Sequence, residues 1–200
     1  MFFKVNPYRL AFDCDGVLLN FDHGFGQVAS DALGRPVIKQ NNAYELHLRY
    51  QLTETEMARV WSALDDHPQG WAGMNPLQGA REAVAYFKAK GFEIHVVTGI
   101  EPRLSETRVA NLLAHSMPID GIVCVGNGKA SKAEHLRSLG PVMFVDDRLF
   151  LLKEAPFVPH RVWVDHQDDQ HGHLLEDPIV QVSSLAHWAQ MWEDGASERS

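Results

Sequence analysis

Apolar and polar positions follow each other along this chain in a pattern that separates short buried strands from amphipathic helices. Runs rich in valine, isoleucine or phenylalanine, each bounded by turn residues, predict strands at residues 8–12, 93–98, 122–125, 142–145 and 161–164. Helical spacing of apolar residues predicts helices between them at residues 80–90, 103–115 and 132–139. Strands that alternate with helices are typical of an α/β protein with a mostly parallel sheet. We therefore predict a three-layer, Rossmann-like core with helices on both faces of the sheet.

One long segment, residues 21–75, breaks this alternation because it contains no convincing strand. Helical stretches occur in it at residues 25–33, 43–48 and 54–64, and Thr53 is a suitable N-cap for the last of them. We interpret residues 21–75 as a small helical cap inserted after the first strand, over one end of the sheet. Residues 1–20 and 76–200 then form the core domain. In the alternative interpretation, these helices simply pack on the core.

Length and composition fit one sizeable domain with a small insertion: 200 residues, of which 45% are hydrophobic and 22% charged. Apolar runs fall far short of the ~20 residues that a membrane-spanning helix needs. The first residues lack the apolar core and cleavage site of a signal peptide. We therefore expect a cytoplasmic protein that does not act at a membrane. Cys14 and Cys124 both lie in strand-like surroundings, so we expect no disulfide framework.

The net charge of −8, with histidine neutral, bears on the partners of the protein. A nucleic acid polymer is a poor partner, because no basic stripe would replace its counterions. A small phosphorylated metabolite remains possible, since a metal ion and one lysine can bind phosphate locally against an acidic overall field. The sequence leaves open whether the protein is a monomer or a homodimer.

Residues 12–18, FDCDGVL, place two carboxylates two positions apart directly after a predicted strand. Asp13 could attack a phosphorus atom and form an aspartyl-phosphate. Asp15 could protonate the leaving oxygen and later activate water, while Gly16 lets the backbone turn sharply. The same pattern also occurs in plain turns and calcium loops. The apolar strand before it and the VLL sequence after it argue against a calcium loop.

Three further features lie at predicted strand ends or helix starts, where ligands of open α/β sheets bind. Thr98 and Gly99 close the VVTG strand and could hold a phosphate oxygen with a hydroxyl and backbone N–H groups. Lys132 could neutralise a phosphoryl oxygen and the Asp13 carboxylate, with Lys129 as the close competitor. The alternative is a lysine that faces solvent, which is the usual place of this residue type.

The third feature, MFVDDR at residues 143–148, ends an apolar strand in two adjacent carboxylates. Such a pair is costly at the edge of a core unless a cation compensates it. Mg²⁺ prefers oxygen ligands, and Asp13, Asp146 and the backbone carbonyl of Asp15 would supply a suitable set. Asp147 would then be an outer ligand or a partner of Lys132.

Together and in this order, the four features resemble the four motifs of the haloacid dehalogenase-like superfamily. The resemblance covers nearly the whole chain and includes the position of the helical cap. It implies that Asp13 is the nucleophile and Asp15 the acid/base, that Thr98 and Lys132 bind phosphate, and that Asp146 binds magnesium. Asp15 distinguishes the chain from the dehalogenases proper, in which halide needs no protonation to leave. The implied activity is that of a phosphatase.

A finer resemblance is carried by Trp71, by Pro76–Ala80 with the helix that follows, and by the stretches DGVLLNF and VDDR. These look like the 5'(3')-deoxyribonucleotidase branch and make a nucleoside monophosphate a candidate substrate. A sugar or glycolate phosphatase, or a phosphotransferase, would use the same site. A non-enzymatic, receiver-like domain that accepts a phosphoryl group is a further alternative, although it needs neither Asp15 nor a long cap.

Three groups of residues outside the four motifs also have a pattern that suggests a role. The run at residues 164–173 holds three histidines and three aspartates; it could bind a transition metal, but we interpret it as a solvated loop. Trp188 and Trp192 are four residues apart, the spacing of a packed helix face. On the cap side, the residues to test for substrate contact are Phe21, Tyr44, Arg49 and Trp71.

Overall fold

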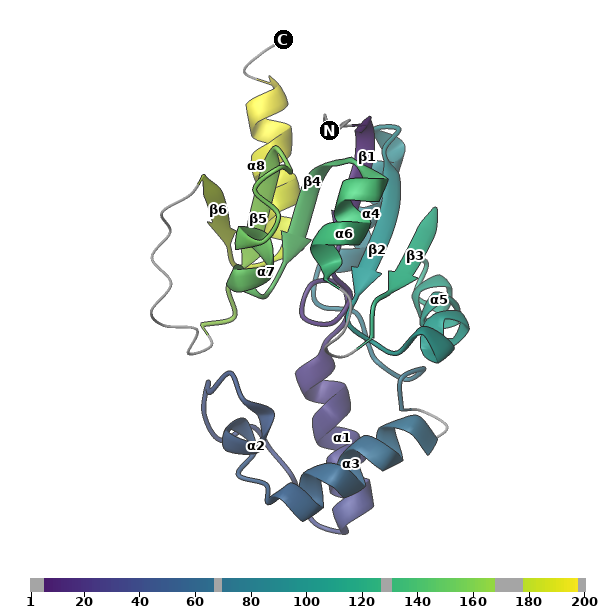
Figure 1. Cartoon of the computed structure of the whole chain (residues 1–200), viewed down its shortest axis with the longest axis vertical. Coiled ribbons are helices and arrows are strands. Elements are labelled where there is room, and N and C mark those ends of the chain that lie inside the picture. The colour runs from purple at the N-terminus through teal and green to yellow at the C-terminus, as the bar shows by residue number, and fades with distance from the viewer. Residues whose placement is uncertain (1–5, 67–69, 127–130, 168–177, 198–200) are drawn as a thin grey trace.

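The computed structural model describes residues 6–66, 70–126, 131–167 and 178–197 of the chain, and its centre is a six-stranded sheet (Figure 1). The strands are β1 (Asn6–Phe12), β2 (Glu93–Thr98), β3 (Gly121–Cys124), β4 (Pro141–Asp146), β5 (His160–Val164) and β6 (Ile179–Val182). They lie in the order β3-β2-β1-β4-β5-β6, and every neighbouring pair is parallel. The predicted α/β fold with a parallel sheet is confirmed.

Helices cover both faces of the sheet, because alternate side chains of each strand point to opposite sides. On one face, Phe12 packs against Phe87 of α4 (Ala80–Ala89), and α8 (Leu185–Ser197) contacts α4. On the other face, Ala11 joins a separate buried cluster with residues of α6 (Lys132–Leu139) and α7 (Leu149–Lys153). A short 3₁₀ helix, η1 (Pro102–Leu104), and α5 (Ser105–Ala114) follow β2. The three predicted layers are therefore present.

Three helices form a separate group beyond the carboxyl ends of the strands: α1 (Phe21–Leu33), α2 (Leu46–Arg49) and α3 (Glu54–Asp66) (Figure 1). The Asn20 side chain caps α1 by accepting a hydrogen bond from His23 N. At the start of α3, Thr53 and Glu56 exchange the reciprocal hydrogen bonds of a capping box. Local sequence signals therefore start α1 and α3, and these two helices also pack against each other.

The chain crosses between the sheet and these helices at two places that lie side by side. Asn20 N donates to Asn75 O at 2.8 Å, and Leu77 N donates to Leu18 O at 2.9 Å. These hydrogen bonds hold the entering and leaving chain segments together, so the helical group lies over the ends of the β-strands. The helical group is therefore joined to the sheet through two adjacent chain segments.

Several elements differ from the sequence prediction. The predicted helix at residues 43–48 is only the short α2, because Asn41 accepts from Ala43 N and donates to Leu48 O, which favours a loop. The predicted helix at 103–115 begins as η1, with Pro102 at its first position. The sequence analysis missed α7 and β6. Among the described residues, no helix combines the length and apolar character needed to cross a membrane.

Candidate active site

A cleft of about 1200 Å³ separates the cap helices from the carboxyl ends of the strands. Its core side carries most of the residues that the sequence singled out: Asp13, Asp15, Thr98, Gly99, Lys132 and Asp147. Parallel strands end at one edge of a sheet, so residues far apart in sequence meet there. The structure therefore brings the predicted residues to one place.

Lys132 joins Asp13 to Asp146 at the bottom of this cleft. Its Nζ lies 2.9 Å from Asp13 Oδ1 and 2.8 Å from Asp146 Oδ2. Lys132 is the first residue of α6, whose N-cap Ser131 accepts a hydrogen bond from Ala133 N. All three side chains are buried, and Asp146 is 0% exposed. Lys132 thus has the placement expected of the site lysine, whereas Lys129 lies outside the described residues.

Asp147 adds a third carboxylate to this group. Asp13, Asp146 and Asp147 each have an oxygen within 4.8 Å of the others. Burial raises the pKa of Asp146 to about 6 although Lys132 opposes the rise, and burial beside Asp146 and Asp13 raises the pKa of Asp147 well above its usual range. Lys132 forms ion pairs with two of these carboxylates, and Arg148 opposes the rise in the pKa of Asp147.

A Mg²⁺ ion fits this donor set, because all three side chains offer hard oxygen ligands. The expected set was Asp13, Asp146 and the backbone carbonyl of Asp15, with Asp147 further out or paired with Lys132. The position of Asp147 makes it a candidate for direct ligation instead. The ion pairs of Lys132 are with Asp13 and Asp146.

Gly16 shapes the turn that carries the first two carboxylates. Its φ of +85° lies in the left-handed region, and an added Cβ would approach Asp147 Oδ2 to 2.5 Å. The turn is closed by Leu18 N and Leu19 N, which both donate to Cys14 O. Gly16 is therefore needed both for the backbone conformation and for the close approach of Asp147.

Asp15 is not a member of the three-carboxylate group and pairs with Arg108 of α5. Nη2 of Arg108 lies 2.9 Å from Oδ1 and 3.0 Å from Oδ2 of Asp15. Burial raises the pKa of the Asp15 carboxyl, and Arg108 opposes that rise without cancelling it. The sequence analysis missed Arg108. A usable signal existed, since Arg108 shares a helix face with Leu112, where an apolar residue is expected.

Thr98 and Gly99 line the cleft at the end of β2. The Thr98 side chain is buried, and its carbonyl accepts a hydrogen bond from Val125 N. Nothing lies within 4 Å of the position that a Gly99 Cβ would occupy, so there is room beside the backbone for a ligand atom. This geometry is compatible with the phosphate-binding role that we predicted.

The cap wall of the cleft combines aromatic side chains with charged ones. The rings of Phe21, Trp61 and Trp71 lie with centroids 6.3–6.5 Å apart, and Trp61 is 36% exposed. Phe21, Tyr44, Arg49 and Trp71, the residues singled out for substrate contact, all line the cleft. Arg49, however, forms an ion pair of 2.8 Å with Asp22 and donates to Ala43 O. Its guanidinium therefore helps to hold the cap together.

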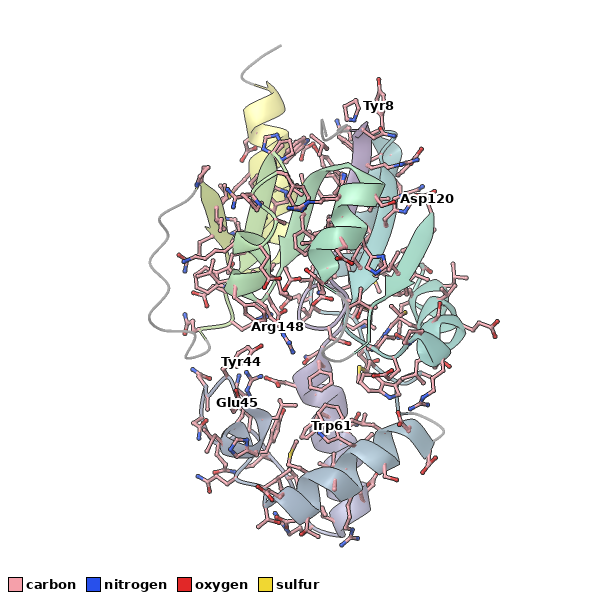
Figure 2. The ribbon with its side chains drawn as sticks, in the orientation of Figure 1. Tyr8, Tyr44, Glu45, Trp61, Asp120 and Arg148 are labelled. Carbon is pink, nitrogen blue, oxygen red and sulfur yellow. The ribbon has the colours of Figure 1, made fainter. Side chains whose placement is uncertain are left out.

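Two arginines reach from the sheet side to the cap. Arg148 places its Cζ 5.5 Å from the ring centroid of Tyr44, and Figure 2 shows the two side chains facing each other across the cleft. On the other side, Arg103 forms an ion pair with Asp65 of α3. The cap thus contacts the core at both sides of the cleft.

Of the run at residues 164–173, interpreted as a solvated loop, His166 is a residue that contacts the site instead. Its side chain lines the cleft, and Nε2 lies 2.6 Å from Gly16 O. His166 therefore borders the site and contacts the turn that carries Asp13 and Asp15. Residues 168–173 of the run lie outside the described residues.

No protein-family model and no curated protein matches the sequence. Solved structures match over nearly the whole chain. An L-2-haloacid dehalogenase from Xanthobacter autotrophicus has a TM-score of 0.60 at 14% identity, covering 94% of this chain and 99% of its own. A predicted phosphatase from Clostridium acetobutylicum has a TM-score of 0.61 at 16% identity, covering 94% and 100%. A predicted phosphoglycolate phosphatase from Haemophilus somnus has a TM-score of 0.59 at 15% identity, covering 93% and 98%.

At these identities the likeness concerns the fold alone. It confirms, at that level, the predicted resemblance to haloacid dehalogenase-like proteins. The relation to the 5'(3')-deoxyribonucleotidase branch stays a prediction.

Proposed function

We propose that this protein is a magnesium-dependent phosphomonoester hydrolase that works through an aspartyl-phosphate on Asp13. The observation that carries the proposal is the joint placement of two carboxylates. Asp13 is paired with Lys132 at 2.9 Å, whereas Asp15, two residues further on, borders the same cleft and is held apart from that pair. In this proposal Asp13 attacks phosphorus, and Asp15 moves a proton.

In the first half-reaction, an oxygen of Asp13 attacks phosphorus and the bond from phosphorus to the leaving oxygen breaks. Asp15, in its protonated form, donates its proton to that oxygen, so the alcohol leaves neutral. Lys132 offsets the charge of the transferring phosphoryl oxygens, and Thr98 with the backbone at Gly99 binds one of them. Asp13 then carries the phosphoryl group.

In the second half-reaction, water attacks the phosphorus atom of the aspartyl-phosphate. Asp15, now a carboxylate, takes a proton from the water, and the bond between phosphorus and the Asp13 oxygen breaks. Inorganic phosphate leaves, Asp13 is again a carboxylate and Asp15 is again protonated. The cap limits access of bulk water to the reacting atoms.

Magnesium is the cofactor that suits this site. Asp13, Asp146 and Asp147, with the Asp15 carbonyl as a further candidate, would hold it. When bound, the ion supplies positive charge to the phosphoryl oxygens.

For the substrate, we propose a small phosphorylated metabolite, with a nucleoside monophosphate as the first candidate. The cleft of about 1200 Å³ is large for glycolate, and its cap wall carries a cluster of three aromatic rings against which a base could stack. A sugar phosphatase or a phosphotransferase would use the same carboxylates. Asp15 argues against dehalogenation, since halide leaves without a proton.

The test is hydrolysis of p-nitrophenyl phosphate by the purified protein. We expect activity with Mg²⁺, none with EDTA, and loss of activity in Asp13→Asn. Asp66→Asn, which changes an exposed carboxylate at the end of α3, is the matched control and should keep full activity. Undiminished turnover in Asp13→Asn would refute the mechanism.

A second experiment addresses the substrate. A panel of deoxynucleoside monophosphates, sugar phosphates, phosphoglycolate and 2-chloropropionate should give its highest kcat/KM with a nucleoside monophosphate. A flat profile would count against a dedicated nucleotidase. No turnover, combined with stable phosphorylation by acetyl phosphate, would favour the receiver-like alternative.

A further inference from the structure

We infer that Arg108 is a positioning residue for Asp15: it fixes the carboxyl group that, in its protonated form, protonates the leaving oxygen, an inference that rests on the proposed function. Arg108 Nη2 contacts both oxygens of that carboxylate, at 2.9 and 3.0 Å. The Arg108 side chain is 0% exposed, whereas that of Asp15 is 19% exposed and borders the cleft. Arg108 thus holds Asp15 from behind and leaves its other side open to a ligand.

A purely structural role is the alternative, in which Arg108 anchors α5 to the chain that leaves the cap. Asn111 already forms that anchor. Asn111, three positions later on the same helix, donates through Nδ2 to both Ala72 O and Met74 O. These contacts tie α5 to residues 72–74 without any buried charge.

The other contacts of Arg108 are weak for a buried guanidinium. Nη1 lies 3.6 Å from Met74 Sδ, and Nε has no hydrogen-bond partner among the described residues. Burying a charge costs several kcal/mol unless partners compensate it. Asp15 is its one ionic partner in the described part of the chain. A residue kept only for packing would be better satisfied or apolar.

Arg108 also contacts the cap exit. Its Cζ lies 5.4 Å from the ring centroid of Trp71, which lines the cleft, and Trp71 Nε1 donates to Asp65 Oδ1 at 2.9 Å. The guanidinium is therefore packed between Asp15 and an anchored ring. Such packing restricts its rotamers, which gives Asp15 a fixed backing.

The loss of activity on replacing Arg108 should depend on the leaving group of the substrate. Phenolate needs a proton as it leaves, whereas p-nitrophenolate leaves readily without one. If Arg108 acts by placing Asp15, its loss should harm hydrolysis of phenyl phosphate more than that of p-nitrophenyl phosphate. A defect in folding or cap packing would lower both rates by the same factor, because the two substrates have nearly the same shape.

The experiment measures kcat/KM of both substrates with Mg²⁺ for wild type, Arg108→Gln, Arg108→Lys, Asp15→Asn and Asp15→Asn/Arg108→Gln. For Arg108→Gln we expect a loss of roughly 100-fold on phenyl phosphate and roughly tenfold or less on p-nitrophenyl phosphate. Arg108→Lys should recover part of the difference. In the Asp15→Asn background, the second substitution should cost little more, since residues that act as a unit are not additive.

Arg161→Lys is the matched control, since Arg161 is also a buried arginine but lies on β5 with Nη1 3.4 Å from Leu152 O. It should leave the ratio of the two rates unchanged. Equal losses on both substrates in Arg108→Gln, or full additivity with Asp15→Asn, would overturn the inference alone. A wild type with no phosphatase activity would refute the proposed function, and the inference with it.

Discussion

Lys132 Nζ lies 2.8 Å from Asp146 Oδ2, and this pair is almost wholly buried. Burial alone would lower the pKa of Lys132, but Asp13 and Asp146 outweigh it and hold that pKa above its usual range. Lys132 is therefore cationic at neutral pH. Its two ion pairs also connect the first motif, at Asp13, to the last motif, at Asp146.

Replacing Lys132 by Met should reduce kcat on p-nitrophenyl phosphate by about 100-fold or more, because a charge that stabilises the transition state is lost. It should also lower Tm in EDTA at pH 7.5, since Asp13 and Asp146 lose their common cation. Steady-state kinetics and thermal unfolding check both effects. Lys88→Met is the control: its ion pair with Asp120 is partly exposed and is expected to contribute little. Activity above half of wild type in Lys132→Met would contradict the assignment.

The pKa of about 6 for Asp146 predicts how magnesium affinity depends on pH. A protonated carboxyl is a poor ligand, so the apparent affinity should fall as pH drops below 6. In the absence of metal, pH affects the stability of the fold in the opposite direction: the contribution of Asp146 to stability falls as pH rises. The folded state binds more protons than the unfolded state between pH 4 and 6, so Asp146 contributes stability at pH 4 that is lost as pH rises through 6.

Titration of Tm with Mg²⁺ at pH 5, 6, 7 and 8 measures this dependence. Asp146→Asn is the comparison, and its Tm should respond weakly to Mg²⁺ at every pH. An affinity in the wild type that is the same at pH 5 and pH 8 would contradict the predicted role of Asp146.

Gly16→Ala tests the turn that places Asp13 and Asp15. The substitution adds a Cβ at a φ of +85° and 2.5 Å from Asp147 Oδ2, so the backbone or the Asp147 carboxylate must move. We expect a loss of stability of roughly 1–2 kcal/mol and a weaker response of Tm to Mg²⁺. Gly34→Ala, also at positive φ but with no atom within 4 Å of its Cβ, isolates the backbone strain. Equal Mg²⁺ responses in the two variants would refute the close-approach argument.

The parts of the site that the sequence predicted are those with a local signal. Asp13, Thr98 and Asp146 stand directly at the ends of apolar runs, and Lys132 stands in the first turn of a helix. Parallel pairing then brings strand ends together without further information. The fold was predictable for the same reason, since its strands alternate with amphipathic helices.

Residues that the sequence analysis missed depend on contacts between distant segments. Arg108 and Asp15 are 93 positions apart, and an arginine on a helix normally faces solvent. His166 lies in a polar stretch whose composition indicates a loop, yet its ring reaches Gly16 O, 150 positions away. Similarly, β6 is a four-residue strand at the sheet edge, too short to show a period.

Arg148 and Tyr44 connect the core to the cap, so we expect the loss of their contact to change KM more than kcat. A cation over an aromatic ring at a partly exposed site is worth about 0.5–1 kcal/mol, which corresponds to a two- to fivefold change in an equilibrium constant. Tyr44→Ala should therefore raise KM for p-nitrophenyl phosphate about two- to fivefold, with a smaller effect on kcat. Tyr44→Phe keeps the ring and should resemble wild type. In Tyr44→Ala/Arg148→Ala the two losses should not add, because each single change already removes the contact. Identical KM values for Tyr44→Phe and Tyr44→Ala would show that the ring does not hold the cap to the core.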